Sequence, residues 1–271
     1  EKVMETTIFT RMFPEAKLKI INALKNDQQI VAMTGDGVND GPALKAAHIG
    51  IAMGKKGTEI AKQAASLILV DDDLSKMIVA VSAGRRIYSN LKKAVQYIVS
   101  IHIPIILIVL LPLVLGWEFT VIFTPIHVIF LELIMGPTCS IVFENEPIEP
   151  DSMNKPPRVM SQTFFSWSEL SLSVVQGLAI TGACLGFGYF LMDSGHNEAT
   201  VRTLIFTTLV LSNVFLTLVN RSFYYSFFRT LVYPNKLIPL ILGISLFLLA
   251  LILTIPGIMN VFDFEAVSLS M

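Results

Sequence analysis

The sequence contains few charged residues and almost no cysteine. Only 15% of its 271 residues are Asp, Glu, Lys or Arg, whereas a soluble globular domain usually carries about 25%. The hydrophobic content of 53% excludes an intrinsically disordered chain. Its two cysteines, Cys139 and Cys184, form no CxxC pair, which excludes a small disulfide scaffold, and both are expected to be buried. A net charge of −1 gives no reason to expect nucleic acid as a partner.

The few charges are concentrated near the beginning of the chain. Residues 1–93 hold 14 of the 20 basic and 10 of the 21 acidic residues. Between Ala94 and Phe143 the only charged residues are Glu118 and Glu132. This distribution indicates a soluble part joined to a membrane part. The expected divisions are a soluble domain over 1–73, a stalk helix over 74–93 and a transmembrane domain over 94–256.

The soluble part alternates short apolar runs with helical segments. Strands that are separated by single helices predict a parallel, doubly wound α/β sheet. A further helix over Pro14–Leu24 precedes them. The expected strands are Gln29–Met33, Ile49–Met53 and Leu67–Val70, and the helices between them are Asp40–Ala47 and Thr58–Ala65.

A long helix is predicted after this domain. Apolar residues keep to one face from Leu74 onward, and no proline follows before Pro104. As a single helix, Leu74–Ile103 would be roughly 45 Å long at 1.5 Å per residue. Because its first half is charged and its second half is apolar, we expect it to lead from the soluble domain into a lipid bilayer.

Five stretches are apolar and long enough to span a bilayer. Basic residues occur in alternate connections, which places residues 1–93 in the cytoplasm and 257–271 outside it, with Arg202 as the exception. The odd number of spans, and a polar start without an initiator Met or a signal peptide, predict a fragment that lacks at least one later helix. The expected spans are about 94–115, 121–143, 170–192, 201–219 and 237–256.

A motif with chemical potential lies where the first strand meets the next helix. It reads Thr-Gly-Asp-Gly-Val-Asn-Asp-Gly-Pro over residues 34–42. The carboxylates of Asp36 and Asp40 would lie at the carboxyl end of a parallel strand, where such folds bind ligands, and could hold Mg²⁺. Gly35 and Gly37 would allow a sharp turn and a close approach to phosphate. The alternative is a polar turn with Asp40 as the cap of the next helix.

The nine-residue motif resembles the hinge motif of the P-type ATPases, and the similarity continues on both sides of it. The resemblance is strong over residues 10–145, is closest to the calcium-pump branch in a bacterial-looking form, and implies a haloacid-dehalogenase-like phosphorylation domain. It would place the protein in a bacterial plasma membrane. The other matching segments are Phe13–Lys17, Ile49–Gly54, Asp71-Asp72, Gly84–Tyr88 and Asn90–Lys93.

The resemblance assigns roles to individual residues. Asp36 would ligate Mg²⁺ at the transferred phosphoryl group, Asn39 and Asp40 would arrange the site, and Lys17 would neutralise phosphate oxygens. Thr34, Gly35 and Gly37 would form the phosphate-facing loop. The family's phosphorylated aspartate, in an Asp-Lys-Thr-Gly-Thr string, is absent from this sequence. ATP would be bound mainly by a missing N-terminal part of the pump, and the chain alone is expected to be inactive.

Polar residues near helix breaks suggest an ion site in the membrane part. Glu132 lies within the second apolar stretch, where a carboxylate is costly and usually functional. Gly136 and Pro137 follow one turn later and would free backbone carbonyls, and Thr138 adds a hydroxyl. His102 lies two residues before Pro104 in the neighbouring span. The alternative is that Glu132 and His102 only pair with each other as a structural contact.

The calcium-pump pattern is only partly met at this membrane site. Position 132 matches a transport-site Asn of the family, and Asn213 fits another family Asn, but the family's Asp one turn after position 132 is Gly136 here. Ca²⁺ takes six to eight oxygen ligands, so two calcium sites are not expected. A single Ca²⁺ site, another divalent cation or a proton or other monovalent cation all remain open.

Two loop segments carry weaker signals, and two other classes of protein also fit the sequence. The acidic residues between Glu144 and Asp151 are expected to form a solvated loop, and the aromatic and basic residues over 221–229 an interfacial belt. A membrane-anchored phosphatase of the haloacid dehalogenase type, or a non-catalytic pump half, are the rivals to a cation pump.

Overall fold

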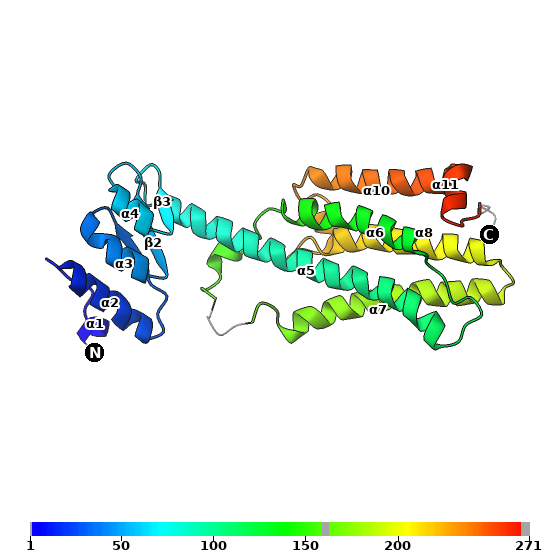
Figure 1. Cartoon of the computed structure of the whole chain (residues 1–271), viewed down its shortest axis with the longest axis horizontal. Helices are drawn as coiled ribbons and strands as arrows, with labels where there is room; N and C mark the ends of the chain where they lie inside the picture. Colours follow the sequence, from blue (N-terminus) through cyan, green and yellow to red (C-terminus); the bar gives the residue numbers. More distant parts are fainter. Residues whose placement is uncertain (1, 159–162, 267–271) are drawn as a thin grey trace. The chain divides into compact units, whose positions relative to one another are not determined.

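A computed structural model describes residues 2–158 and 163–266 of the chain (Figure 1). The chain forms two compact units, residues 1–81 and residues 82–271. Each unit has its own arrangement of elements and is described by itself.

The first unit is built on a three-stranded parallel sheet with the strand order β1-β2-β3. Ala32 of β1 pairs with Ile49 of β2, and Ile51 pairs with Leu67 of β3. This arrangement confirms the predicted parallel α/β sheet. The strands are β1 Ala32–Gly35, β2 Ile49–Met53 and β3 Leu67–Leu69, and the helices are α1 Lys2–Glu5, α2 Pro14–Asn26, α3 Gly41–Ala46 and α4 Glu59–Ala64.

The first strand begins three residues later than the apolar run predicts, at Ala32 and not at Gln29. The residues before it complete the end of α2 instead. Gln28 adopts a positive φ of 62°, and the N–H of Gln29 donates to the carbonyl of Leu24 at 3.1 Å, which is a usual way to end a helix. The motif over 34–42 therefore begins inside the strand.

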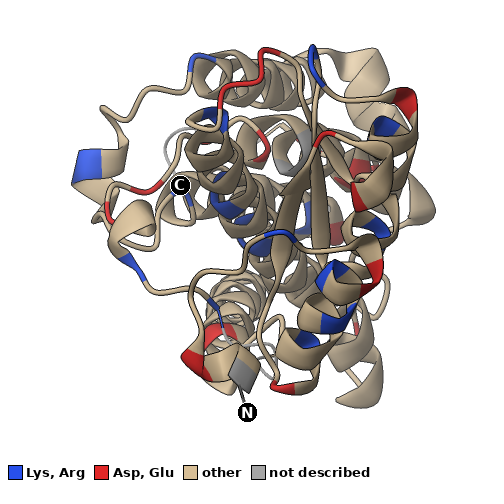
Figure 2. Ribbon diagram, turned by 90° about the vertical axis from the view of Figure 1, so that its left-hand side faces the viewer, with Lys and Arg blue, Asp and Glu red and all other residues tan. Residues whose placement is uncertain are grey.

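A small apolar core holds this unit together. Ile21 of α2, Val31 and Ala43 of α3 form one buried cluster, and Leu44, Ala52 and Ala61 form a second one. The charged side chains lie on the helices and loops and not on the three strands (Figure 2). Because the strands carry no charged side chains, a site that binds a charged ligand is expected in the loops at the strand ends.

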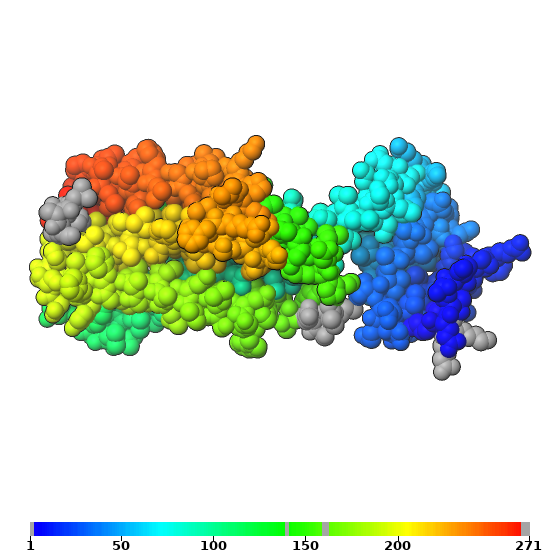
Figure 3. All heavy atoms as spheres, turned by 180° about the vertical axis from the view of Figure 1, so that it is seen from behind, coloured from blue at the N-terminus to red at the C-terminus, as the bar shows by residue number. Residues whose placement is uncertain are grey.

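The second unit is a bundle of long apolar helices. Among the described residues, five helices are long and apolar enough to cross a membrane. Figure 3 shows the surfaces of α7, α8 and α10 lying side by side. The helices are α5 Lys76–Val114, α6 Pro125–Pro137, continued as a π-helix over Thr138–Phe143, α7 Trp167–Asp193, α8 Glu198–Val219, α9 Phe227–Thr230, α10 Leu237–Thr254 and α11 Pro256–Val261. Short 3₁₀ turns occur at Ser152–Asn154 in this unit and at Val38–Asp40 in the first unit.

Helix α5 continues through the proline at which we expected it to break. It contains Pro104 and Pro112 and ends at Val114. Pro104 has no N–H for the carbonyl of Ser100, one turn earlier. At this carbonyl α7 carries Gly177, where a Cβ would lie 2.9 Å from the Ser100 oxygen. Gly177 of α7 thus packs closely at the turn of α5 in which the Ser100 carbonyl receives no N–H from Pro104. Membrane helices tolerate a proline where a neighbouring helix packs closely in this way.

Arg202, the exception to the charge pattern, is buried in the second unit. It is only 8% exposed, and its guanidinium donates to the carbonyls of Val121, Ile122 and Asp263 at 2.9 to 3.2 Å. These carbonyls belong to irregular backbone that lacks helical partners. Arg202 therefore serves an internal structural role, because it supplies hydrogen bonds to these carbonyls.

The acidic loop between α6 and α7 differs from the prediction of a solvated segment. Glu146 is fully buried and accepts from Nε of Arg221 at 3.0 Å and from Nδ2 of Asn235 at 2.9 Å. Glu149 is 6% exposed, and its Oε1 lies 2.7 Å from Nζ of Lys93 on α5, in an ion pair without hydrogen-bond geometry. These five residues, which we term the buried ion-pair cluster, tie three segments together. Arg221 is accordingly a core residue and not part of an exposed belt.

Candidate functional site

The loop that follows β1 brings the motif residues together in the first unit. Gly35 is the last residue of β1, Asp36 is the first residue beyond it, and the turn Val38–Asp40 leads into α3. The backbone carbonyl of Asp36 accepts from the N–H of Thr58 at 2.8 Å. This bond anchors the loop to the start of α4. The carboxylate of Asp36 remains exposed at the carboxyl end of the strand.

Asp40 is the buried centre of this loop. It is 7% exposed, and its Oδ1 accepts from Nζ of Lys17 on α2 at 2.5 Å. Its Oδ2 accepts from the backbone N–H groups of Asp36 and Gly37, both at 3.3 Å. Burial alone would raise the pKa of the Asp40 carboxyl, but the hydrogen bond from Lys17 and those from the backbone outweigh it and hold that pKa below its usual value.

The two aspartates of the motif, Asp36 and Asp40, differ in the contacts and in the exposure of their carboxylates. Oδ1 of Asp40 is engaged by Lys17 on α2, and Oδ2 is engaged by the backbone of the loop. Asp40 occupies the N-cap position of α3, as the alternative predicts, but its side chain makes no capping bond to that helix. Asp36 keeps an exposed carboxylate, and Thr34 and Asn39 are exposed beside it. Asp40 is thus suited to position the loop and Asp36 to meet a ligand.

The arrangement fits Mg²⁺ better than a cation that needs a protein cage. The described residues contain no cluster of three or more His, Cys, Asp or Glu side chains. Mg²⁺ is commonly held by one or two carboxylates together with phosphate oxygens and water. Asp36 can supply such a carboxylate, and Lys17 retains one-third of its side-chain exposure for further donation.

The two glycines of the loop have different roles, which yields a prediction. A Cβ at Gly35 would lie 2.6 Å from Cβ of Asp40, whereas a Cβ at Gly37 would lie 3.7 Å from the nearest atom. We expect Gly35→Ala to destabilise the protein by about 1–3 kcal/mol, since Asp40 must shift. Thermal denaturation measures the effect, and Gly37→Ala is the matched control. Equal stability of the two variants would contradict this packing.

In the second unit the structure brings His102 of α5 next to Glu132 of α6. Nε2 of His102 lies 3.1 Å from Oε1 of Glu132, and the two side chains are 40% and 50% exposed. The pairing that the sequence offered as an alternative is therefore present. Because 40% of the His102 side chain and 50% of the Glu132 side chain remain exposed, the pairing leaves room for further ligands.

The hydrogen bond between His102 and Ile98 indicates which ring nitrogen of His102 carries a proton. Its Nδ1 is 2.8 Å from the carbonyl oxygen of Ile98, which can only accept, so Nδ1 carries a proton. The contact of Nε2 with Oε1 of Glu132 at 3.1 Å is an ion pair only if the imidazole carries a second proton.

The other membrane candidates lie on α6, on the π-helix that follows it and on α8. Thr138 is 2% exposed and donates to the carbonyl of Ile134 at 3.3 Å, and Gly136 directly precedes Pro137, where α6 passes into the π-helix. Asn213 of α8 is 3% exposed, and its Nδ2 contacts Sδ of Met135 at 3.5 Å. Its buried Oδ1 has no hydrogen-bond partner among the described residues.

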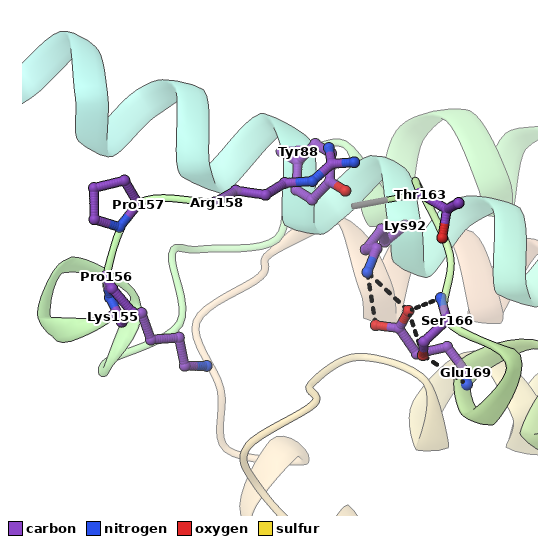
Figure 4. A pocket seen from close by; sticks show the side chains of 9 residues that line it. All are labelled: Tyr88, Lys92, Lys155, Pro156, Pro157, Arg158, Thr163, Ser166 and Glu169. Atoms are coloured by element: carbon purple, nitrogen blue, oxygen red, sulfur yellow. Dashed lines mark hydrogen bonds and ion pairs between the residues drawn. The ribbon is translucent and has the colours of Figure 1, made fainter. Parts of the chain in front are cut away.

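Sequence reasoning missed a further set of functional candidates. Lys155 and Arg158, in the loop before α7, line a pocket together with Lys92 of α5 (Figure 4). Their signal was the presence of basic residues at the ends of apolar spans, where charges often face lipid headgroups. The distance along the chain between Lys92 and the other two hid their proximity.

Comparisons with known proteins match both units. A family model described as "Cation transporting ATPase, C-terminus" matches residues 120–271, more than half of the chain. A model described as "haloacid dehalogenase-like hydrolase" matches residues 15–75. The second match fits the parallel sheet and the first fits the helical bundle.

Several characterised relatives cover most of the chain. It is 34% identical over 266 residues to "Calcium-transporting ATPase 1" of Lactococcus lactis, covering 98% of this chain and 30% of that protein. It is 39% identical over 192 residues to "Calcium-transporting ATPase 4, endoplasmic reticulum-type" of Arabidopsis thaliana, and this match covers 70% of this chain and 18% of that protein. It is 33% identical over 266 residues to "Probable cation-transporting ATPase F" of Mycobacterium bovis, and this match covers 97% of this chain and 29% of that protein.

The chain spans about 30% of the length of the first of these relatives. Its parallel α/β unit, its long apolar helices and both family matches point in the same direction. The chain belongs to the P-type cation-transporting ATPases and corresponds to part of their C-terminal region.

Proposed function

We propose that the pump to which this chain contributes exports Ca²⁺ or another divalent cation through an aspartyl-phosphate intermediate. The observation that carries this proposal is the loop after β1, in which Lys17 and the backbone hold Asp40 and leave Asp36 exposed. The names of the Lactococcus and Arabidopsis relatives support calcium as the cargo. Membership of the cation-pump family favours a pump over a membrane-anchored phosphatase or a non-catalytic half.

The first unit would act as half of the phosphorylation domain. Asp36 would hold Mg²⁺, which when bound supplies positive charge to the transferred phosphoryl group. Lys17 would donate to phosphate oxygens as well as to Asp40, while Asn39 and Asp40 keep the loop in place. Thr34, Gly35 and Gly37 would bring the backbone close to the phosphate. The phosphorylated aspartate and most of the ATP site would come from another part of the pump.

The second unit would carry the transported ion. Glu132 and the unpartnered Oδ1 of Asn213 supply two oxygens, and Thr138 and the carbonyls near Gly136 supply others where α6 leaves α-helical geometry. We place residues 1–93 on the cytoplasmic side of a bacterial plasma membrane. The five long apolar helices support the membrane placement.

A proton is the second candidate cargo, and one observation favours it. When Nδ1 of His102 donates to Ile98, an ion pair between His102 and Glu132 would need a second proton on the imidazole. A site that holds a proton in one state and releases it in another can transport it. Protons and metal ions would then compete for Glu132.

The test measures phosphoenzyme formation by the complete pump against each cation. We expect Ca²⁺ to stimulate phosphorylation, and Glu132→Gln to raise the Ca²⁺ concentration for half-maximal stimulation at least about tenfold, because a charged ligand is lost. Glu118→Gln is the control, since Glu118 is an exposed carboxylate in the connection between α5 and α6.

Two outcomes would redirect the proposal. Unchanged Ca²⁺ dependence in the Glu132→Gln variant would remove Glu132 as a ligand. Phosphorylation that responds to pH but to no divalent cation would favour the proton as cargo.

A further inference from the structure

The loop between β2 and α4, residues 54–58, supports Asp36 through a backbone hydrogen bond. The N–H of Thr58, the last residue of this loop, donates to the carbonyl oxygen of Asp36 at 2.8 Å. The Asp36 side chain begins at the Cα beside that carbonyl, so the place where the carbonyl is held limits where the carboxylate can lie. The position of the β2–α4 loop therefore bears on the ligand that Asp36 would supply.

Asp72, three residues after β3, holds the other end of the β2–α4 loop. Its Oδ1 and Oδ2 accept from the backbone N–H groups of Lys55 and Lys56, both at 2.9 Å. Desolvation by itself would raise the pKa of the Asp72 carboxyl, but the hydrogen bonds from these N–H groups outweigh it and hold that pKa below its usual value. The carboxylate is therefore charged at neutral pH, and its hydrogen bonds are charge-assisted.

The β2–α4 loop is packed too closely to absorb a change at one end. A Cβ at Gly57 would lie 2.0 Å from the carbonyl oxygen of Met53, so the backbone of the loop lies directly on the end of β2. Gly57 is also the only residue between Lys56 and Thr58, two points at which the loop is held. With strand backbone on one side, the loop cannot move inward when the hold at Lys56 is lost. A change at Lys56 is thus expected to displace Thr58.

The backbone of Asp72 has a conformation that few other residues adopt. Its φ is 60°, in the left-handed region where Asn and Asp are enriched among residues other than glycine. The N–H of Asp72 donates to the carbonyl of Leu69 at 3.0 Å, which closes a turn directly after β3. This turn brings the carboxylate back to the β2–α4 loop, and asparagine is the replacement that can keep it.

We propose that Asp72 is a positioning residue for Asp36, acting through the backbone of the β2–α4 loop and the N–H of Thr58. The inference rests on the proposed function, in which Asp36 holds Mg²⁺. Asp72 itself would touch neither the ion nor the phosphoryl group. Its role is to keep Asp36 in place before the ion binds, because a ligand that is already ordered loses less entropy on binding. Groups that orient metal ligands in this way typically contribute about 10- to 100-fold to metal affinity.

The first experiment measures the binding of Mn²⁺, which takes oxygen ligands as Mg²⁺ does, to the complete pump. Free Mn²⁺ is followed by electron paramagnetic resonance, and only the ions whose binding depends on added vanadate, a phosphate analogue, are counted. We expect Asp72→Asn to raise the dissociation constant about tenfold, since the amide cannot accept from both N–H groups. Asp71→Asn is the matched control, because the Asp71 side chain is 65% exposed and its Oδ1 lies 3.9 Å from Nζ of Lys55. Equal affinity in the two variants would overturn the proposal.

Hydrogen exchange without any metal reports how firmly the loops are held. We expect Asp72→Asn to speed the exchange of the N–H groups in residues 55–58 and in the motif over 34–42, because both lose support. Peptides from α2 should exchange as in the unaltered protein. Faster exchange confined to residues 55 and 56 would contradict the connection to Asp36. Faster exchange throughout the first unit would do so too, because it indicates general unfolding.

Removing the N–H of Thr58 tests the step next to Asp36. Thr58 has a φ of −67°, which proline also adopts, so Thr58→Pro deletes this donor at a compatible position. Its control is Thr58→Ala, which keeps the N–H and loses only the hydroxyl that accepts from the N–H of Ala61 in α4. We expect Thr58→Pro to weaken Mn²⁺ binding about tenfold more than Thr58→Ala does. Adding Asp72→Asn to Thr58→Pro should change little, because both act through one hydrogen bond.

The remaining outcomes separate this inference from the proposed function. Weaker Mn²⁺ binding in Asp36→Asn but not in Asp72→Asn would overturn the inference alone, as would fully additive losses in the double variant. Unchanged Mn²⁺ binding in Asp36→Asn would contradict the proposed function, and hydrogen exchange would then decide by itself whether Asp72 holds Asp36 in place. If thermal denaturation shows that Thr58→Pro is unfolded, the two experiments on Asp72→Asn carry the test.

Discussion

Replacing Arg221 by methionine is expected to destabilise the second unit by about 3–5 kcal/mol. The guanidinium is 2% exposed and donates to Glu146, to the carbonyl of Thr230 and, at 3.0 Å, to the carbonyl of Tyr233. Its loss leaves the fully buried carboxylate of Glu146 without a compensating charge. Thermal denaturation in detergent micelles at neutral pH measures the change.

Two further variants separate this buried pair from a general effect of removing charge. Arg229→Met removes an exposed arginine a few residues away, and we expect less than about 1 kcal/mol from it. Combining Arg221→Met with Glu146→Leu should recover part of the lost stability, because no unpaired charge then remains. A double variant less stable than Arg221→Met alone would show that the orphaned carboxylate is not the cause.

Replacing Asp36 by asparagine is expected to slow phosphoenzyme formation in the complete pump by about 100- to 1,000-fold. The exposed carboxylate at the end of β1 would be the oxygen ligand that the loop presents, whereas Asp40 is already engaged with Lys17 and the backbone. Asparagine keeps the shape and removes the charge. The rate of labelling from radioactive ATP, measured over a range of Mg²⁺ concentrations, gives the effect.

The Mg²⁺ dependence separates loss of a ligand from a folding defect. If Asp36 holds the ion, its replacement should raise the Mg²⁺ concentration needed for labelling while thermal stability stays unchanged. Asp27→Asn, at an exposed position after α2, should behave as the unaltered protein does. An unchanged Mg²⁺ requirement in Asp36→Asn would assign the ion to other residues.

Local patterns were sufficient to predict the elements of the fold. Runs such as Ile49–Met53 became strands because apolar side chains at this spacing bury well in a sheet between helices. The strand after α2 was misplaced because Gln28 and Gln29 end that helix through backbone bonds, which hydropathy does not report. The proximity of His102 and Glu132 was anticipated because both lie on adjacent spans.

Whether an individual charged side chain is buried, paired or exposed was harder to predict. Glu146 looks like a loop residue in the sequence, yet its partner Arg221 lies 75 positions away. The contact between Lys17 and Asp40 spans 23 positions and was suggested only by resemblance to a family. The free energy of a charged group depends on the dipoles and charges within a few ångströms of it, and distant segments supply those neighbours.

The amino-acid sequence by itself determined the division into a charged α/β part and five apolar helices, together with the motif over residues 34–42, because hydropathy and short motifs act locally. Only the tertiary structure decided which carboxylates are engaged and which are exposed. It tied Asp40 to Lys17 and left Asp36 exposed, buried Glu146 against Arg221, and gathered Lys92, Lys155 and Arg158 around one pocket. These outcomes depend on packing between remote segments, since burial makes a charge costly unless folding brings a partner to it.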